Sequence, residues 1–134
     1  MIILKEKSAV LRESLFRKMT VAGKIPSLHI SNDENINNTS GKIRLEESDW
    51  DELIDTVDEL FGGFASLLQK EYSNLNKEDI GFCCLIKINV SMQDLADIYC
   101  ITKAGITKKK TRIKKDKFNI QDENLSLDGF LALL

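Results

Sequence analysis

Long apolar runs, leader sequences and histidine are scarce or missing in this chain of 134 residues, and each absence excludes a class of protein. No apolar stretch approaches the roughly 18 residues that a membrane-spanning helix needs. The opening "MIILKEKSAVLRE" lacks the basic-then-apolar order of a secretory signal. With 43% hydrophobic and 30% charged residues, the composition predicts one or two small globular domains. We therefore expect a cytoplasmic protein.

Cysteine is also sparse, with three residues in the whole chain. An odd number that includes an adjacent pair matches neither a disulfide framework nor the spacing of zinc ligands. We expect Cys83, Cys84 and Cys100 to be buried, reduced thiols that pack as small apolar side chains.

Residues typical of catalytic and metal sites do not form recognisable groups. His29 is the single histidine, and its position between Pro26 and a polar loop predicts a surface side chain. The sequence has no glycine-rich phosphate loop and no Ser-His-Asp or Cys-His arrangement. It also lacks the alternating strands and helices of a receiver domain with a phosphoacceptor aspartate. We expect no enzyme activity, catalytic residue, metal site, cofactor or small-molecule substrate.

The first 25 residues are typical of one long helix. Their seam positions alternate in steps of four and three, as in a heptad repeat: Leu4, Ser8, Leu11, Leu15, Lys18, Ala22 and Ile25. A serine and a lysine on the seam weaken an isolated coiled coil, so the helix either pairs in a dimer or packs on its own domain. We expect it to end at Ile25, because the residue before Pro26 is disfavoured from the α region.

A polar loop and two more helices are predicted next. Residues 31–42 are rich in Asn, Ser and Asp and predict a surface loop. Ser48 and Asp51 form a capping pattern ahead of an amphipathic helix with an acidic outer face. Gly62 and Gly63 interrupt this pattern, which predicts a break followed by a short helix.

Three cap residues divide the chain from Leu75 onward into short helices. Asn76, Ser91 and Thr102 each precede a segment with helical apolar spacing. The final segment, "LSLDGFLALL", predicts either a closing helix or a dimer surface. Because no β-type alternation of useful length is present, the predicted fold class is all-α.

Charge is distributed unevenly along the chain. Eight basic residues lie between Lys103 and Lys117 with a single acid, Asp116, so this segment has a net charge of +7. The whole chain has a net charge of -2, which leaves -9 for the remainder, much of it in "EESDWDELIDTVDE". Such separation suggests a polyanionic partner for the basic segment, whereas the alternative is a helix face that is merely solvated.

Met92 to Lys109 is typical of two short helices that cross steeply around a tight turn. The small side chain of Ala96 would allow the second helix to approach closely. Apolar contacts between the two helices are expected from Leu95, Ala96, Tyr99, Ile101 and Ile106. Ile113 extends the buried stripe, and we expect the basic and hydroxyl side chains between these anchors to point outward.

The stretch "LNKEDIGFCCLIKINVSMQDLADIYCITKAGITKKKTRIKKDKFNI" is similar to the LuxR-type helix-turn-helix, in the form that ends bacterial sensor regulators with tetratricopeptide repeats and a coiled coil upstream. In that group a "KIPSL"-like segment follows a long helix, and a "DWDELIDTVDELFGGF"-like segment precedes "NLNKEDIGFCCLIKINVS". The likeness runs from about Leu11 to Leu134. The chain departs from the pattern at Cys100, where a turn glycine is common, at Lys109, where a late apolar anchor is common, and at Gly105, which weakens the start of the recognition helix.

The resemblance implies a DNA-binding transcriptional regulator, with residues 1–72 as a helical, coiled-coil dimerisation and linker region and residues 73–134 as a helix-turn-helix DNA-binding domain. It also implies a sensor region, often with a membrane segment, ahead of this region in the full-length protein, of which the chain would be the cytoplasmic output part. We expect a homodimer on double-stranded DNA, because one recognition helix reads only a few base pairs.

Ten residues around the predicted recognition helix are candidates for DNA contact. The candidates for base edges are Thr102, Lys103, Thr107, Lys108 and Thr111. The candidates for phosphates are Lys109, Lys110, Arg112, Lys114 and Lys115. If about five of the basic side chains neutralise phosphates, log affinity should fall against log salt with a slope near -4 to -5.

A helical protein–protein interaction module without DNA binding is the main alternative, with the acidic and basic helices recognising proteins. Binding to RNA would need exposed aromatic side chains near the lysines, and the neighbouring Tyr99 and Phe118 are better explained as core. Binding to an anionic membrane would need a broad apolar helix face, and Ile106 and Ile113 make a narrow one.

Overall fold

The structure is a computed structural model, and it describes residues 19–28 and 43–134. Every regular element within these ranges is helical, which confirms the all-α prediction. The elements are the 3-10 helices η1 (Thr20–Lys24) and η2 (Pro26–Leu28) and the α-helices α2 (Glu47–Leu60), α3 (Phe64–Glu71), α4 (Lys77–Lys87), α5 (Met92–Tyr99), α6 (Lys103–Asp116) and α7 (Leu127–Leu133).

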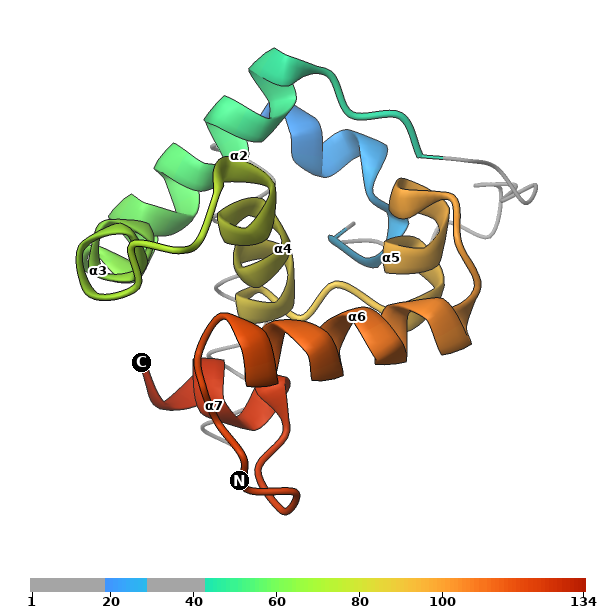
Figure 1. The fold of residues 1–134 in the computed structure, drawn as a ribbon. Helices are drawn as coiled ribbons and strands as arrows, with labels where there is room; N and C mark the ends of the chain where they lie inside the picture. The colour runs from blue at the N-terminus through green and yellow to red at the C-terminus, as the bar shows by residue number, and fades with distance from the viewer. Residues whose placement is uncertain (1–18, 29–42) are drawn as a thin grey trace, which may run out of the picture.

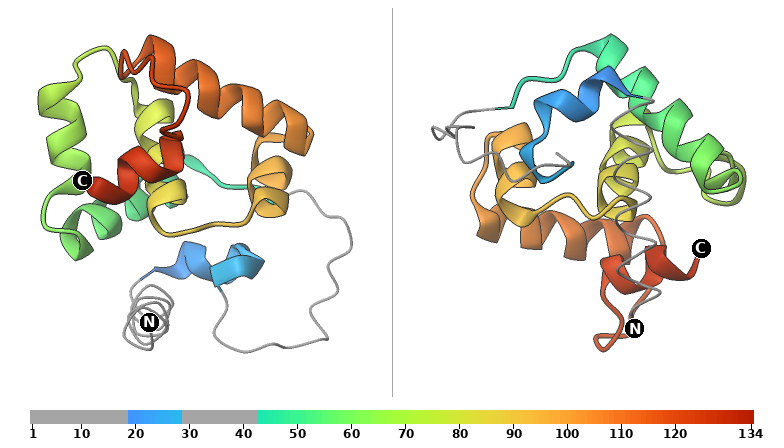
Figure 2. Two further views of the ribbon diagram at one scale, coloured as in Figure 1. Left: turned by 90° about the horizontal axis from the view of Figure 1, so that it is seen from below. Right: turned by 180° about the vertical axis from the view of Figure 1, so that it is seen from behind.

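Helix α4 lies at the centre of the molecule, with α2 and α3 on one side, α5 and α6 on the other, and α7 beneath (Figures 1 and 2). Its sequence explains this position, because the side chains from Ile80 to Ile86 are buried all around the helix. A helix that is apolar on every face is stable only when other elements cover it. The hydrophobic core is therefore built around α4.

Gly81 allows α2 to pack closely on α4. A Cβ atom at this position would lie 2.8 Å from Cε3 of Trp50, which is shorter than carbon atoms can approach. The indole of Trp50 thus lies against bare backbone, and this contact fixes the indole at the edge of the core.

The segment around Pro26 differs from the predicted helix. The predicted long helix falls mainly on residues 1–18, which lie outside the described residues, as do His29 and the predicted loop 31–42. Residues 20–24 form a 3-10 helix, so the prediction of one α-helix reaching Ile25 is wrong for this part. The carboxylate of Glu52 on α2 accepts hydrogen bonds from the backbone N–H of Val21 and the hydroxyl of Thr20, which ties the short turn to α2. Ala22 and Ile25 are buried in the core of the same chain.

The predicted caps of three helices are confirmed. The side chains of Asn76, Ser91 and Thr102 accept hydrogen bonds from the backbone N–H three residues later, at 2.8, 3.1 and 3.0 Å. These bonds satisfy donors that have no partner inside the helix. The prediction of a cap at Ser48 is wrong, because α2 begins one residue earlier and Asp49 accepts from the N–H of Glu46 at 2.8 Å.

The predicted break between α2 and α3 is also confirmed. Gly62 and Gly63 have φ values of 63° and 97°, which are accessible to glycine at little cost. The chain changes direction there, and Asp58 accepts hydrogen bonds from the N–H and hydroxyl of Ser66 across the turn (Figure 1). The final segment forms helix α7, one of its two predicted roles.

The cysteines divide into two environments. Cys83 and Cys84 are fully buried on α4, as predicted, and burial raises the pKa of the Cys83 thiol to about 12. Cys100 is exposed, so its predicted burial is wrong. It occupies the turn after α5 with φ 56° and ψ 41°, and this left-handed conformation directs the side chain away from the core.

Residues of both predicted regions contribute to one hydrophobic core, from Met19 and Leu53 to Ile106 and Leu131. The boundary at residues 72 and 73 falls in the loop between α3 and α4 and stays a prediction. In the described parts of the chain, no helix has the length and apolar character needed to cross a membrane.

Candidate nucleic-acid interface

Helices α5 and α6 are joined by a tight turn at residues 100–102. The backbone N–H of Ile101 donates to the carbonyl of Ala96 at 3.1 Å, and Thr102 then caps α6. Leu95, Ala96 and Ile106 are buried between the two helices, as predicted. Ile113 is 2% exposed and anchors the second half of α6.

One of the predicted apolar contacts differs from expectation, and a second, Tyr99, is only partly buried. Ile101 is 42% exposed, so its predicted place in the crossing is wrong. The left-handed turn at Cys100 carries Ile101 past the end of α5, where its side chain lies near Gly105 instead. Tyr99 is half-buried and packs edge-on against Phe82 of α4, with ring centroids 5.4 Å apart.

All five predicted base-edge candidates lie on the exposed surface of α6 or at its N-cap. Thr102, Lys103, Thr107, Lys108 and Thr111 are exposed. The hydroxyls of Thr107 and Thr111 donate to the carbonyls of Lys103 and Thr107, one helical turn earlier. Their oxygens therefore remain free to accept a hydrogen bond.

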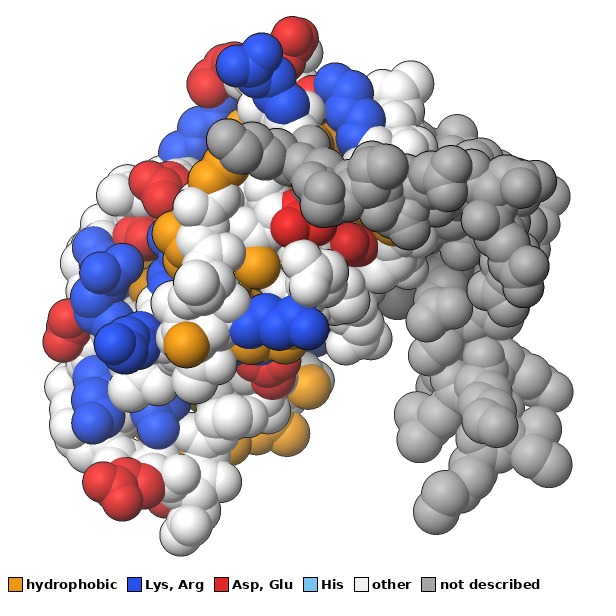
Figure 3. Space-filling view, turned by 90° about the vertical axis from the view of Figure 1, so that its right-hand side faces the viewer, with side chains coloured by type: hydrophobic (Ala, Val, Ile, Leu, Met, Phe, Trp, Pro, Cys, Tyr) orange, Lys and Arg blue, Asp and Glu red, His pale blue; other side chains and the backbone are white. Residues whose placement is uncertain are grey.

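The predicted phosphate candidates divide into two groups. Arg112 and Lys115 are exposed and share a face of α6 with Lys108, whereas the exposed Lys103 lies at the start of the helix on another side. Among the described residues, none of these four side chains forms a salt bridge. Figure 3 views the end of the molecule where α6 begins and shows several Lys and Arg side chains on this face, with Asp and Glu side chains among them.

Lys109, Lys110 and Lys114 were expected to point outward, and the structure shows that this is wrong. The ammonium of Lys109 lies 4.7 Å from the ring centroid of Tyr99 and 3.2 Å from a carboxylate oxygen of Glu78. Lys110 forms a salt bridge of 3.0 Å with Asp128 at the start of α7. Both side chains lie along the edge of the buried stripe, where their alkyl stems cover apolar surface.

Lys114 is the most deeply buried basic residue in the described parts of the chain. Only 7% of the surface of Lys114 is exposed to solvent. Its ammonium donates a hydrogen bond to the backbone carbonyl of Asp122 at 3.0 Å. The backbone carbonyl of Lys114 also accepts from the N–H of Ile120 at 3.0 Å. Lys114 therefore secures the connection between α6 and α7.

The acidic neighbours of α6 lie at its margins and not on its outward face. Glu78 and Asp128 bind Lys109 and Lys110, and Asp79 lies 3.4 Å from the ammonium of Lys117. Acids thus pair with Lys109 and Lys110, whereas Lys114 is bound by a backbone carbonyl and keeps its charge. The exposed lysines and arginine of α6 form no salt bridge among the described residues.

A metal-based site has no support in this part of the molecule. Within residues 19–28 and 43–134, no three His, Cys, Asp or Glu side chains come together in a way that could hold a metal ion.

Comparison with protein-family models, with curated proteins and with solved structures found no match.

Proposed function

We propose that the chain is a sequence-specific transcriptional regulator that binds duplex DNA through a LuxR-type helix-turn-helix formed by α5 and α6. The observation that carries this proposal is the exposed surface of α6, on which Lys103, Lys108, Arg112 and Lys115 form no intramolecular salt bridge in the described structure. Charges that a protein leaves unpaired on one face are available to neutralise an anionic partner.

The dimensions of α6 support a role as recognition helix. Its 14 residues span about 21 Å, and its inward side is held by Ile106 and Ile113, so the helix can be inserted as a rigid rod. The amino-terminal half carries threonines and lysines that can reach base edges. Arg112 and Lys115 in the second half are suited to phosphates.

The structure reduces the number of phosphate contacts that the proposal uses. Lys109, Lys110 and Lys114 would have to leave Glu78, Asp128 and the Asp122 carbonyl, respectively, before they could bind DNA. Four free cations predict a slope of about -3.6 for log affinity against log salt on B-DNA, shallower than the value expected from five or more.

The proposal includes a cytoplasmic homodimer, because one such helix reads too few base pairs for useful specificity. Residues 1–18, predicted as the dimerising helix, lie outside the described residues. At the other end of the chain, Leu133 is 78% exposed and offers apolar surface. The proposal involves no catalytic step, metal ion or cofactor.

The test is fluorescence anisotropy of a labelled duplex of mixed sequence over a series of salt concentrations. We compare the wild type with Lys108→Ala/Lys115→Ala, whose slope should be shallower by about 1.8. Lys115→Ala alone should flatten it by about 0.9. The matched control is Lys70→Ala, which removes one positive charge from an exposed position on α3. This variant should leave the salt slope unchanged.

Absence of DNA binding at low salt by folded, dimeric protein would refute the proposal. The helical protein–protein interaction module would then be the better interpretation of the acidic and basic helices. A slope that Lys70→Ala flattens as much as Lys115→Ala would indicate a diffuse charge effect and not a defined DNA-binding face.

A further inference from the structure

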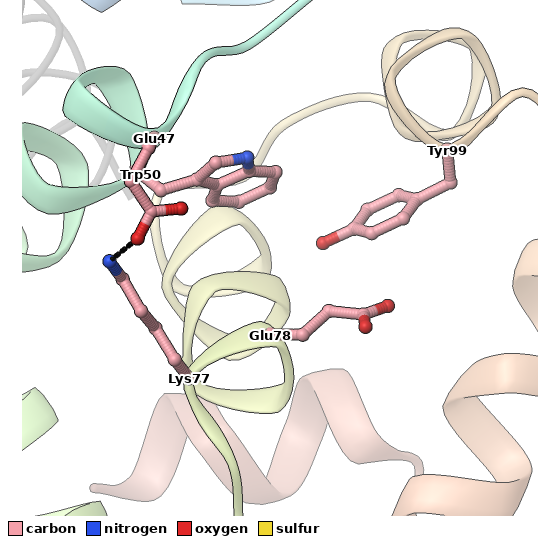
Figure 4. Close-up of a pocket in the computed structure, with 5 residues that line it drawn as sticks. All are labelled: Glu47, Trp50, Lys77, Glu78 and Tyr99. Atoms are coloured by element: carbon pink, nitrogen blue, oxygen red, sulfur yellow. Dashed lines mark hydrogen bonds and ion pairs between the residues drawn. The ribbon is translucent and has the colours of Figure 1, made fainter.

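A pocket of about 380 Å³ lies between α2, α4 and α5. It is lined by Glu47 and Trp50 of α2, Lys77 and Glu78 of α4, and Tyr99 of α5 (Figure 4). This volume lies within the range of pockets that bind small molecules, about 300–1,000 Å³. None of these five residues is a candidate for DNA contact, so the pocket is a separate site.

The aromatic walls of the pocket are held in place by the core. Trp50 packs against the backbone of Gly81, and Tyr99 packs edge-on against Phe82. The ring centroids of Trp50 and Tyr99 are 6.0 Å apart and the ring planes are tilted by 46°. A third ring between them would need a contact distance of about 3.5 Å on each side. The apolar part of a ligand must therefore lie beside the two rings.

The hydroxyl of Tyr99 lacks a partner inside the protein. Its oxygen is buried, and it is the one buried side-chain nitrogen or oxygen of the described residues without a hydrogen bond. Figure 4 shows this hydroxyl directed between Trp50 and Glu78. Burial raises the pKa of Tyr99, and the negative charge of Glu78 raises it further, so the phenol keeps its proton. Because buried donors are almost always hydrogen-bonded, the pocket calls for a ligand that brings an acceptor.

The charged residues that line the pocket are already paired within the protein. Lys77 is bound by Glu47 at 2.5 Å and by Asp51. A carboxylate oxygen of Glu78 lies 3.2 Å from the ammonium of Lys109. A charged ligand would have to break one of these pairs or stay without a counter-charge, and both are unfavourable in a partly buried site.

Neither sign of charge has a vacant position. The ammonium of Lys109 lies 4.7 Å from the ring centroid of Tyr99, where a cationic ligand would otherwise bind, and it would repel a second cation. An anionic ligand would face the carboxylates of Glu47 and Glu78 in the pocket wall. The ligand that fits these surroundings is uncharged.

We propose that this pocket binds a small, uncharged aromatic carboxamide. Its carbonyl oxygen accepts a hydrogen bond from the hydroxyl of Tyr99. Its N–H group donates to the carboxylate of Glu78, which has lone pairs left beside its bond to Lys109. Its ring lies against the exposed part of the half-buried Trp50 indole, as aromatic rings pack edge-on or offset on one another.

The single tryptophan of the chain gives one indole N–H signal in proton–nitrogen NMR spectra, and Trp50 lines the pocket. We would titrate the isotope-labelled full chain with benzamide, benzoate and benzylammonium at constant ionic strength and follow this signal. Benzamide should shift it saturably, with a Kd in the millimolar range expected for so small a ligand. Benzoate and benzylammonium carry the same ring, and each should bind at least about fivefold more weakly because its charge has no free partner.

Two variants identify the groups responsible, with acetophenone as a second ligand. Acetophenone keeps the ring and the carbonyl of benzamide but has a methyl group in place of the amide nitrogen. Tyr99→Phe removes only the hydroxyl and should weaken both ligands about fivefold, the usual effect of one hydrogen bond. Glu78→Ala should weaken benzamide by a similar factor and leave acetophenone unchanged, because acetophenone has no N–H group to donate.

Two controls separate a binding effect from a general one. Tyr72→Phe should change neither affinity, because Tyr72 packs against Phe118 and Phe130 away from the pocket. Since the Tyr99 hydroxyl has no partner, Tyr99→Phe should be as stable in thermal unfolding as the wild type or more stable.

Three results would each overturn the proposal. They are no saturable shift with benzamide, equal affinity of the wild type and Tyr99→Phe for benzamide, and binding of benzoate or benzylammonium as tight as that of benzamide. An equal loss of benzamide and acetophenone in Glu78→Ala would refute the hydrogen bond assigned to Glu78. None of these measurements contains DNA, so their outcome is independent of the proposed function.

Discussion

Lys114 should contribute to stability and not to nucleic-acid binding, although it lies within the basic segment. Its ammonium donates to the Asp122 carbonyl at 3.0 Å and the residue is 7% exposed. In Lys114→Met the alkyl stem keeps roughly its volume, while a hydrogen bond from a charged donor, worth about 1.5–3 kcal/mol, is lost. Relief of the buried charge offsets part of this loss. We expect Lys114→Met to lower the free energy of unfolding by about 1–2 kcal/mol.

Urea unfolding followed by circular dichroism would measure this effect. Lys115→Met is the matched control, because Lys115 is adjacent and exposed, and its substitution should change stability by less than about 0.5 kcal/mol. The Tm of Lys114→Met should fall by roughly 4 °C for each kcal/mol lost, as expected for a chain of 134 residues. If Lys114→Met were as stable as Lys115→Met, the assigned role of Lys114 in securing the α6–α7 connection would be refuted.

Two further predictions concern the turn and the acid dependence of stability. Cys100→Gly should stabilise the protein by about 1 kcal/mol, because Cys100 is exposed and has φ 56°, and calorimetry would show a higher Tm. Asp49 is buried, which by itself raises its pKa, but hydrogen bonds from Lys24 and from the backbone of Glu46 lower the pKa of Asp49 below 3.8. A carboxylate whose pKa is lowered by folding stabilises the folded state at pH values above its pKa in the unfolded chain, about 4. This stabilisation disappears as the pH falls through the pKa of the folded state. Asp49→Asn should therefore have a lower Tm at pH 7 and a smaller further loss of Tm between pH 5 and pH 3, and an unchanged acid profile would contradict the pairing with Lys24.

The helix starts at Asn76, Ser91 and Thr102 could be predicted because each cap and its backbone donor are three residues apart. A pairing between residues only three positions apart can be recognised in a short window of sequence. The same holds for the break at Gly62 and Gly63, where two adjacent glycines permit positive φ values. These helix ends were therefore predictable from the sequence, whereas the arrangement of the helices around α4 was not predicted.

The inward orientation of three lysines on α6 was not predicted, although helical spacing indicates it for two of them. Lys109 and Lys110 follow Ile106 by three and four residues and so border the buried stripe. The expectation that lysine is exposed outweighed this geometry. For Lys114 the deciding partner is a carbonyl eight residues away in a loop, and no periodicity encodes such a contact.

The pocket could not be predicted because its walls come from distant parts of the sequence. Trp50, Glu78 and Tyr99 lie on three helices, and each is unremarkable within its own helix. Their convergence depends on the close approach of α2 and α4 at Gly81. Only the packed structure brings an aromatic pair, a carboxylate and a hydroxyl without a partner to one place.

The apolar surface of α4 limits which fragments of this chain can fold alone and which can be transferred to another protein by gene rearrangement. Phe82, Cys83, Cys84 and Leu85 are 0% exposed, and α2, α3 and α7 all take part in covering α4. A fragment beginning at residue 73 would lack α2 and α3 and would expose part of that surface to water. We therefore expect α2 to α7 to unfold in one cooperative transition. A gene rearrangement that moved α6 without α2 would transfer a helix without the scaffold that orients it.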